Sequence, residues 1–318
     1  MFKKRSAAVI LGLGILLLIF SACGGRNEAP AAALSANQQS ARPDRDREGY
    51  AITLPEKINR IASVGPSNTE ILVGLGFSGR IIAADIYSAD VAGISPNTSA
   101  ALDIMALDAE YIVSLMPDVV FITGMARGGS GDNPLAPVTA AGISVIYMPT
   151  SGSIAAIMED IRFIAAVMDA RETGERLVFG MQAEIDKIKE ISKTITETRT
   201  VYFEISPAPW MYSTGKGTFL NEIIELTGAE NIFKDQTGWL SVSDEALLAA
   251  NPDVILTTTD FLDDPIGEIL GRPGFGAVAA VRNRNVYMID TNSSSRPSQN
   301  ITKALREIAQ AVYPEYYR

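Results

Sequence analysis

The clearest amphipathic pattern in the chain lies near its middle, between Thr173 and Ile195. Apolar residues recur there every three or four positions, which is the spacing of one face of an α-helix. These residues are Leu177, Met181, Ile185, Ile188, Ile191 and Ile195. At about 1.5 Å per residue, such a helix would be roughly 35 Å long. The pattern predicts a helical bridge between two lobes or, alternatively, one more surface helix of a single domain.

The sequence on either side of this helix repeats one pattern. Residues 108–123 and residues 243–258 each begin with a side chain suited to capping a helix, Asp108 and Ser243. A short helical stretch, a Pro-Asp stop and a β-branched run then follow in matching register. Matched caps, stops and strands predict two α/β lobes of similar plan.

Other apolar runs predict the remaining elements of both lobes. Strands are expected over residues 60–64, 81–84, 144–148, 200–205 and 286–289, and helices over 67–75, 154–168, 219–227 and 301–312. The predicted fold class is α/β, with two Rossmann-like lobes joined by a single long helix. The expected domains are a first lobe over residues 51–171, the bridging helix over 172–198 and a second lobe over 199–318.

The start of the chain has the features of an export signal. Residues 1–22 combine a basic beginning with an apolar run that is too short for an ordinary membrane span, and Cys23 follows. This ending resembles a bacterial lipoprotein signal, in which the cysteine carries the lipid, although Phe20 stands where leucine is usual. An uncleaved anchor helix is the alternative. Both interpretations place the rest of the chain outside the cytoplasmic membrane. Residues 23–50 are polar and lack an apolar period, which predicts a disordered, lipid-anchored tether.

Charge and composition exclude several classes of function. The net charge of −10 argues against binding nucleic acid or anionic lipid, so the predicted contact with the membrane is the lipid anchor alone. The chain has no histidine, which removes the commonest metal ligand and general base. Its only cysteine is Cys23, which leaves no internal disulfide or thiolate cluster. We therefore predict no catalytic residue, no metal site and no cofactor.

One motif has the spelling of a dinucleotide site in the wrong context. The glycines of residues 74–79 follow the GxGxxG pattern, but they close a predicted helix and precede a strand. The dinucleotide fingerprint needs a strand, then the glycines, then a helix. These glycines are better interpreted as a helix stop and a turn.

Candidate binding residues come from the loops at the carboxyl ends of the predicted strands, where open α/β sheets bind their ligands. In an acidic protein, these loops gather aromatic and cationic side chains. The candidates are Tyr87, Arg127, Trp210, Tyr212, Lys216, Trp239, Phe261 and Arg296. Both tryptophans lie in predicted loops. The set suits a large ligand with flat apolar parts and some negative charge, held by stacking and by guanidinium pairing.

Several segments together resemble the substrate-binding proteins of ABC importers for iron–siderophore complexes, haem and cobalamin. They are residues 60–70, both Pro-Asp units, and residues 215–219, 228–233 and 295–297. The resemblance implies the class III periplasmic-binding-protein fold, a ligand held between two lobes and little hinge motion. It also implies, as partners, an ABC permease dimer with its ATPase, docked through an acid on each lobe. Asp132 stands near the first docking position, and Asp263 or Asp264 stands near the second.

The leading hypothesis is a substrate-binding lipoprotein, not an enzyme, that delivers a ferric siderophore-type chelate to its permease. In this hypothesis Arg127 and Arg296 pair with the ligand's oxygens. Cobalamin or haem is the alternative ligand; histidine ligation is excluded, although tyrosine can bind haem iron. Alternatives of another class are a cell-surface enzyme that acts through carboxylates such as Asp260 and Asp263, and a ligand sensor for a membrane receptor.

Overall fold

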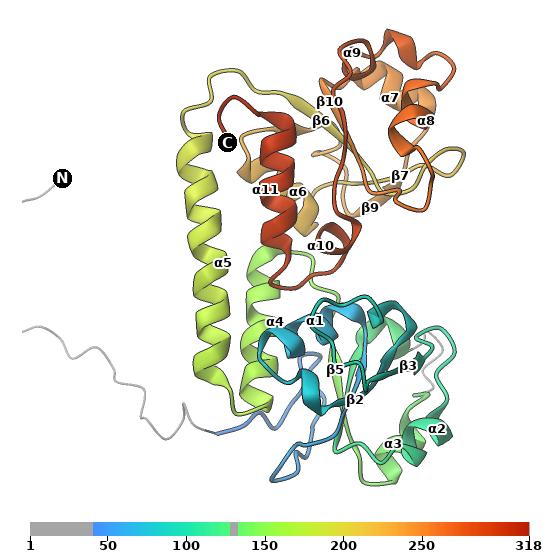
Figure 1. The fold of residues 1–318 in the computed structure, drawn as a ribbon, viewed down its shortest axis with the longest axis vertical. Helices are drawn as coiled ribbons and strands as arrows, with labels where there is room; N and C mark the ends of the chain where they lie inside the picture. Colours follow the sequence, from blue (N-terminus) through green and yellow to red (C-terminus); the bar gives the residue numbers. More distant parts are fainter. Residues whose placement is uncertain (1–40, 128–132, 318) are drawn as a thin grey trace, which may run out of the picture. The chain divides into compact units, whose positions relative to one another are not determined.

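The computed structural model describes residues 41–127 and 133–317, and from Arg42 on these form two α/β lobes (Figure 1). The first lobe is built on a parallel sheet with the strand order β3-β2-β1-β4-β5. Its strands are β1 (Ile61–Val64), β2 (Ile81–Asp85), β3 (Ser99–Leu102), β4 (Val119–Thr123) and β5 (Ser144–Met148). Its helices are α1 (Pro66–Gly74), α2 (Ala109–Ser114) and α3 (Ala136–Ala140).

The second lobe has a parallel sheet with the order β11-β10-β6-β8 and a separate antiparallel pair, β7 and β9. The strands are β6 (Thr200–Glu204), β7 (Tyr212–Thr214), β8 (Glu230–Asn231), β9 (Trp239–Ser241), β10 (Val254–Thr257) and β11 (Val286–Met288). The helices are α6 (Phe219–Leu226), α7 (Asp244–Ala250), α8 (Pro265–Leu270), α9 (Ala279–Arg282), α10 (Thr291–Ser295) and α11 (Ile301–Val312). The central strands β1, β4 and β10 are almost wholly buried, as expected for parallel sheets covered on both faces.

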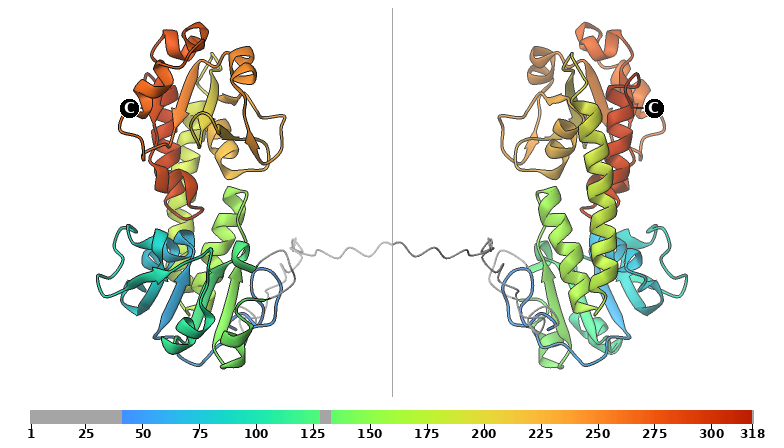
Figure 2. Two further views of the ribbon diagram at one scale, coloured as in Figure 1. Left: turned by 90° about the vertical axis from the view of Figure 1, so that its right-hand side faces the viewer. Right: turned by 90° about the vertical axis from the view of Figure 1, so that its left-hand side faces the viewer.

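The predicted bridging helix is present as α5 (Arg171–Ser192), which runs beside both lobes (Figure 2). Met181, Ile185 and Ile188 are buried, as the amphipathic pattern predicts. The structure adds a second helix, α4 (Ile154–Val167), packed along α5. The backbone N–H of Ile154 donates to Glu222 of α6 at 2.8 Å, so α4 also reaches the second lobe.

The apolar core does not stop at the boundary between the lobes. One cluster of buried side chains runs from β1 and α1 through α4 and α5 into α6 and α11. Two further clusters each belong to one lobe, on the far face of its sheet. Because a close-packed core transmits strain rather than yielding, this continuity makes the connection between the lobes stiff.

The end of the predicted tether departs from the expectation of disorder. Arg42 donates to the carbonyl oxygens of Val167 and Pro55, and the backbone N–H of Tyr147 donates to Asp46 at 3.1 Å. We call residues 42–52 the strap. The strap is ordered because its charged residues bond to groups of the first lobe, which no local sequence pattern reveals. Cys23 and the rest of the tether lie outside the described residues, and no described helix is long and apolar enough to cross a membrane.

Candidate functional site

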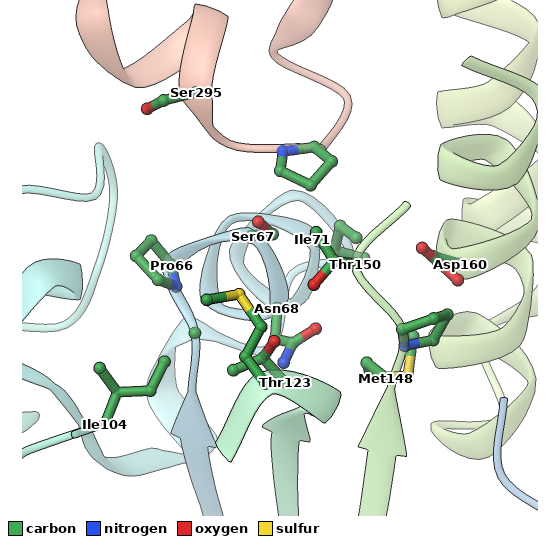
Figure 3. A pocket seen from close by; sticks show the side chains of 14 residues that line it. Pro66, Ser67, Asn68, Ile71, Ile104, Thr123, Met148, Thr150, Asp160 and Ser295 are labelled. Atoms are coloured by element: carbon green, nitrogen blue, oxygen red, sulfur yellow. The ribbon is translucent and has the colours of Figure 1, made fainter. Parts of the chain in front are cut away.

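A pocket lies at the carboxyl ends of the strands of the first lobe (Figure 3). Its empty volume is about 630 Å³, part of it open to solvent. It is lined by Gly65, Pro66, Ser67, Asn68, Ile71, Ile104, Thr123, Met125, Met148, Pro149, Thr150, Asp160, Ser295 and Pro297. Only Ser295 and Pro297 come from the second lobe, so the pocket is closed on one side by the other lobe. This position agrees with the predicted location of the site at the strand ends.

A buried carboxylate fixes the conformation of the turn after β1. Asp85, fully buried at the end of β2, accepts hydrogen bonds from the backbone N–H of Gly65 at 2.8 Å and from Ser88 at 2.6 Å. Gly65 has a φ of +113°, a conformation that only glycine adopts readily. The turn therefore directs the first residues of α1, including Ser67 and Asn68, at the pocket.

A second buried acid, Asp160 of α4, lines the pocket on the side of the strap. Its carboxylate pairs with Arg47 of the strap at 2.8 Å and accepts a hydrogen bond from Ser151. Burial raises the pKa of Asp160, whereas the bonds from Ser151 and Arg47 lower it. Because both carboxylate oxygens already have partners, Asp160 shapes the pocket rather than offering a free charge to a ligand.

Arg296, predicted to meet the ligand's oxygens, is instead engaged in protein contacts. Its guanidinium pairs with Glu70 at 3.3 Å and Asp90 at 2.9 Å, and donates to the carbonyl oxygen of Tyr87 at 3.0 Å. Only 11% of the Arg296 side chain is exposed. These partners lie more than 200 residues earlier in the chain, so the sequence pattern around Arg296 could not reveal them. A direct role of Arg296 in ligand binding stays a prediction.

The other candidate residues lie outside the lining of this pocket in the described part of the chain. Trp239 and Tyr212 were expected in loops but belong to β9 and β7, which pair with each other. Trp239 packs edge-to-face on Phe219 with ring centroids 6.2 Å apart. Lys216 is exposed at the end of the same ribbon, and Tyr87, Trp210 and Phe261 are more than half exposed. Arg127 ends a 3-10 helix, and its side chain lies outside the description.

Of the predicted docking acids, the structure describes the two in the second lobe. Asp264 caps α8 by accepting a hydrogen bond from the backbone N–H of Gly267 at 2.8 Å. Asp263 beside it is exposed. Asp132 lies outside the described residues.

The sequence reasoning missed the neutral residues that line the pocket, because it selected aromatic and cationic side chains. The available signal was position alone: Pro66, Ser67, Thr123 and Thr150 each end a strand or follow one closely. Among the described lining side chains, hydroxyl, amide, methionine and proline groups dominate, and none is arginine or lysine. The described residues also contain no cluster of three or more acidic or cysteine side chains suited to a metal ion.

Comparison with known proteins decides the family. The model of the periplasmic binding protein family matches residues 61–292. The chain belongs to the periplasmic binding protein family. Members of this family bind ligands and are not enzymes, which removes the carboxylate-dependent enzyme from the alternatives.

Two relatives of this periplasmic binding protein are informative. The chain is 27% identical to the uncharacterized ABC transporter substrate-binding lipoprotein YvrC of Bacillus subtilis, over 99% of each chain. It is 24% identical to a vitamin B12-binding protein of Vibrio campbellii, over 79% of this chain and 88% of the relative.

Solved structures show the same two-lobed fold. A possible iron-binding periplasmic solute-binding protein from Staphylococcus epidermidis has a TM-score of 0.71 and 29% identity, covering 81% of this chain and 100% of that one. The periplasmic haem-binding protein RhuT from Roseiflexus has a TM-score of 0.71 and 26% identity, covering 81% and 98%. The protein is thus an extracytoplasmic substrate-binding component of an ABC importer with the class III fold.

Proposed function

We propose that this periplasmic binding protein captures a corrinoid of the cobalamin class between its lobes and delivers it to an ABC permease. The observation that carries the proposal is the lining of the pocket, which holds several hydroxyl groups and in which the one described charged residue, Asp160, is already paired with Arg47. The engagement of Arg296 by Glu70 and Asp90 adds to it. A corrinoid presents a flat, apolar macrocycle whose edge bears neutral carboxamides. Hydroxyl and amide side chains can exchange hydrogen bonds with such carboxamides, and methionine and proline can pack on the macrocycle.

The size of the pocket fits one edge of such a ligand. The pocket, at about 630 Å³ including space open to solvent, is smaller than a whole corrinoid, so the remainder would extend beyond it. Trp210, which is 82% exposed, and Tyr87, which is 53% exposed, are the candidates for stacking on it. Similarity to proteins named for vitamin B12 binding supports the same ligand class.

Titration calorimetry of the full chain with cyanocobalamin, a ferric hydroxamate siderophore and haemin tests the proposal. We expect cyanocobalamin to bind at least about tenfold more tightly than the other two, a difference of roughly 1.4 kcal/mol. Thr123→Val removes a hydroxyl from the pocket at constant volume and should weaken the binding of cyanocobalamin. Thr194→Val, at the carboxyl-terminal end of α5, is the matched control and should leave it unchanged. Tighter binding of the siderophore or haemin would overturn the proposal.

A ferric siderophore is the second candidate, and one observation favours it. Lys216 is an exposed cation on the ribbon that also carries Tyr212 and Trp239, a combination suited to an anionic, flat chelate. If this candidate is correct, Lys216→Gln should weaken binding of the ferric siderophore and leave binding of cyanocobalamin unchanged.

We also propose that the chain is held at the membrane through a lipid on Cys23. The likeness to YvrC, which is named a lipoprotein, supports this anchor. Cell fractionation tests it: Cys23→Ser should release the protein from the membrane fraction. Retention of the variant in that fraction would point to an uncleaved anchor helix.

A further inference from the structure

Residues 292–300, which run from α10 to the start of α11, belong to the second lobe but also bond to the first. They include Asn292, Arg296, Ser298 and Asn300, whose side chains all reach acids of the first lobe. These acids are Glu70 on α1 and Asp90, which follows the 3-10 helix Ile86–Ser88. The two lobes are therefore joined by a polar contact in addition to α4 and α5.

Glu70 is the centre of this contact and is only 4% exposed. Its carboxylate pairs with Arg296 at 3.3 Å and accepts hydrogen bonds from Ser298 and, at 2.8 Å, from Asn300. Its backbone carbonyl accepts a further bond from Gln299 at 2.8 Å. Burial raises the pKa of Glu70, whereas the bonds from Ser298, Asn300 and Arg296 lower it. These bonds replace the hydrogen bonds to water that the carboxylate loses on burial.

Asp90 holds the other side of the same arginine. It pairs with Arg296 at 2.9 Å and accepts a hydrogen bond from Asn292 at 2.8 Å. Although partial burial acts in the opposite direction, the bonds from Asn292 and Arg296 hold the pKa of Asp90 below its usual value. Arg296 is therefore held by acids on two sides, which fixes the position of its guanidinium.

The first lobe also leaves room for this segment. A Cβ atom at Gly74 would lie 2.8 Å from the side-chain nitrogen of Gln299, closer than real side chains approach. Glycine at the end of α1 therefore lets Gln299 reach the carbonyl of Glu70. The two surfaces fit each other in shape as well as in charge.

We propose that Glu70, Asp90 and Arg296 form a brace that sets the width of the ligand cleft. Ser295 and Pro297, on either side of Arg296, line the pocket, and so do Asn68 and Ile71 beside Glu70. The brace thus connects the two walls of the pocket directly behind their lining. Glu70 and Arg296 act as positioning residues: they place Ser295 and Pro297 opposite the loops of the first lobe without contacting the ligand themselves.

Because the ion pair of the brace is buried, we expect the distance between the lobes to change when one of its charges is removed. Removing Arg296 leaves Glu70 buried without its counter-charge, and removing Glu70 leaves Arg296 with Asp90 as its only ion-pair partner. Either change favours separation of the two surfaces, so that water can reach the remaining charge. Loss of an exposed pair has no such consequence. Arg306 of α11 and Glu184 of α5, which pair at 3.0 Å and are about half and one-third exposed, supply that control.

The width of the cleft in the ligand-free protein tests the brace independently of the ligand. Spin labels at Glu110→Cys on α2 and Ala249→Cys on α7, in a full chain carrying Cys23→Ser, report the distance between the lobes. We expect a narrow distribution of label-to-label distances in the parent chain and in Arg306→Ala, and a broader or shifted one in Glu70→Gln and Arg296→Ala. The brace is wrong if these two variants match the parent, or if Arg306→Ala broadens the distribution equally.

Ligand affinity is the second readout, and it rests on the proposed function. For cyanocobalamin, Arg296→Ala should raise Kd by about 5- to 150-fold, the usual range for coupling between a remote element and a site. Asp90→Asn, which removes the more exposed partner, should have a smaller effect. If the parent chain binds no corrinoid, the proposed function fails while the distance measurement still decides on the brace. Unchanged affinity in Arg296→Ala, with the parent chain binding normally, contradicts the positioning role.

Discussion

At the scale of single residues, backbone conformation and buried charges shape the pocket. The turn at Gly65 has a positive φ, and a Cβ there would lie 3.3 Å from the side-chain nitrogen of Asn68. The N–H of Gly65 is also held by the buried Asp85. One small residue therefore determines how the start of α1 meets the pocket.

Substitution of Gly65 tests this point. Gly65→Ala should lower the free energy of unfolding by about 1–3 kcal/mol because alanine is strained at this φ. It should also weaken ligand binding, because the added methyl group displaces Asn68. Gly79→Ala is the control, since a Cβ at Gly79 meets no atom within 4 Å. Chemical denaturation and calorimetry with cyanocobalamin provide the measurements; equal behaviour of the two variants contradicts the account.

At the residue scale, the sequence predicts where a pocket should lie but not which residues pair with each other. The expectation that a ligand binds at the strand ends comes from a general property of parallel sheets, and a pocket lies at those ends. That Arg296 is occupied depends on Glu70 and Asp90, which become its neighbours only through folding. An arginine in a polar segment has the same sequence pattern whether it meets a ligand or a buried acid.

At the scale of elements, long apolar or amphipathic segments were predicted well. The strand over residues 144–148 and the buried face of α5 agree with the structure. Strands β3 and β9 were missed because most of their residues are partly or fully exposed and so show no buried run. Helix α10 was missed because it consists of threonine, asparagine and serine; its start is stabilised by the cap of Asp290.

Two glycines of α5 allow a test of the helix pair. A Cβ at Gly174 would lie 2.5 Å from that of Ala165 on α4, whereas one at Gly180 would meet open space. Gly180→Ala should stabilise the protein by up to about 1 kcal/mol through helix propensity alone. Gly174→Ala should destabilise it in spite of that gain, because it pushes α4 and α5 apart. Thermal unfolding distinguishes the two, and stabilisation by Gly174→Ala would show that the helices are not closely packed.

Tyr317 links α5 to the second lobe, and its ionisation should lower the stability of the protein at alkaline pH. Its hydroxyl proton is shared between the carbonyl oxygens of Thr227 at 2.9 Å and Ile188 at 3.3 Å, and burial raises the pKa of Tyr317 to about 12. A raised pKa means that the neutral phenol stabilises the fold fully below the unfolded pKa of about 10 and loses this contribution as the pH rises through 12. Tyr317→Phe should therefore be less stable at pH 8, yet lose less stability between pH 10 and 12. The free energy of unfolding is measured by urea denaturation at several pH values. If it falls equally with pH in the parent chain and in Tyr317→Phe, the assignment is contradicted.

At the scale of the whole molecule, two walls belonging to different lobes enclose the pocket, and a continuous core runs between the lobes. This arrangement favours capture without a large closing motion. The remaining steps, delivery and release, then depend on the permease.

Docking can be separated from ligand binding by charge reversal. Asp263 and Asp264 are both exposed, but Asp264 also caps α8, so we expect Asp263 to carry the contact with the permease. Asp263→Lys should reduce ligand uptake by cells and leave the affinity of the purified protein unchanged. Asp264→Lys should in addition lower thermal stability through the lost cap. If Asp263→Lys weakens ligand binding itself, the acid belongs to the cleft and not to the docking surface.

The most direct test of the account is hydrogen exchange measured by mass spectrometry, with and without cyanocobalamin. If the ligand is held between the lobes, exchange should slow at residues 65–71 and 148–151 of the first lobe and at residues 292–298 of the second. Slowing in one lobe only, or in neither, would contradict the claim that both lobes enclose the ligand.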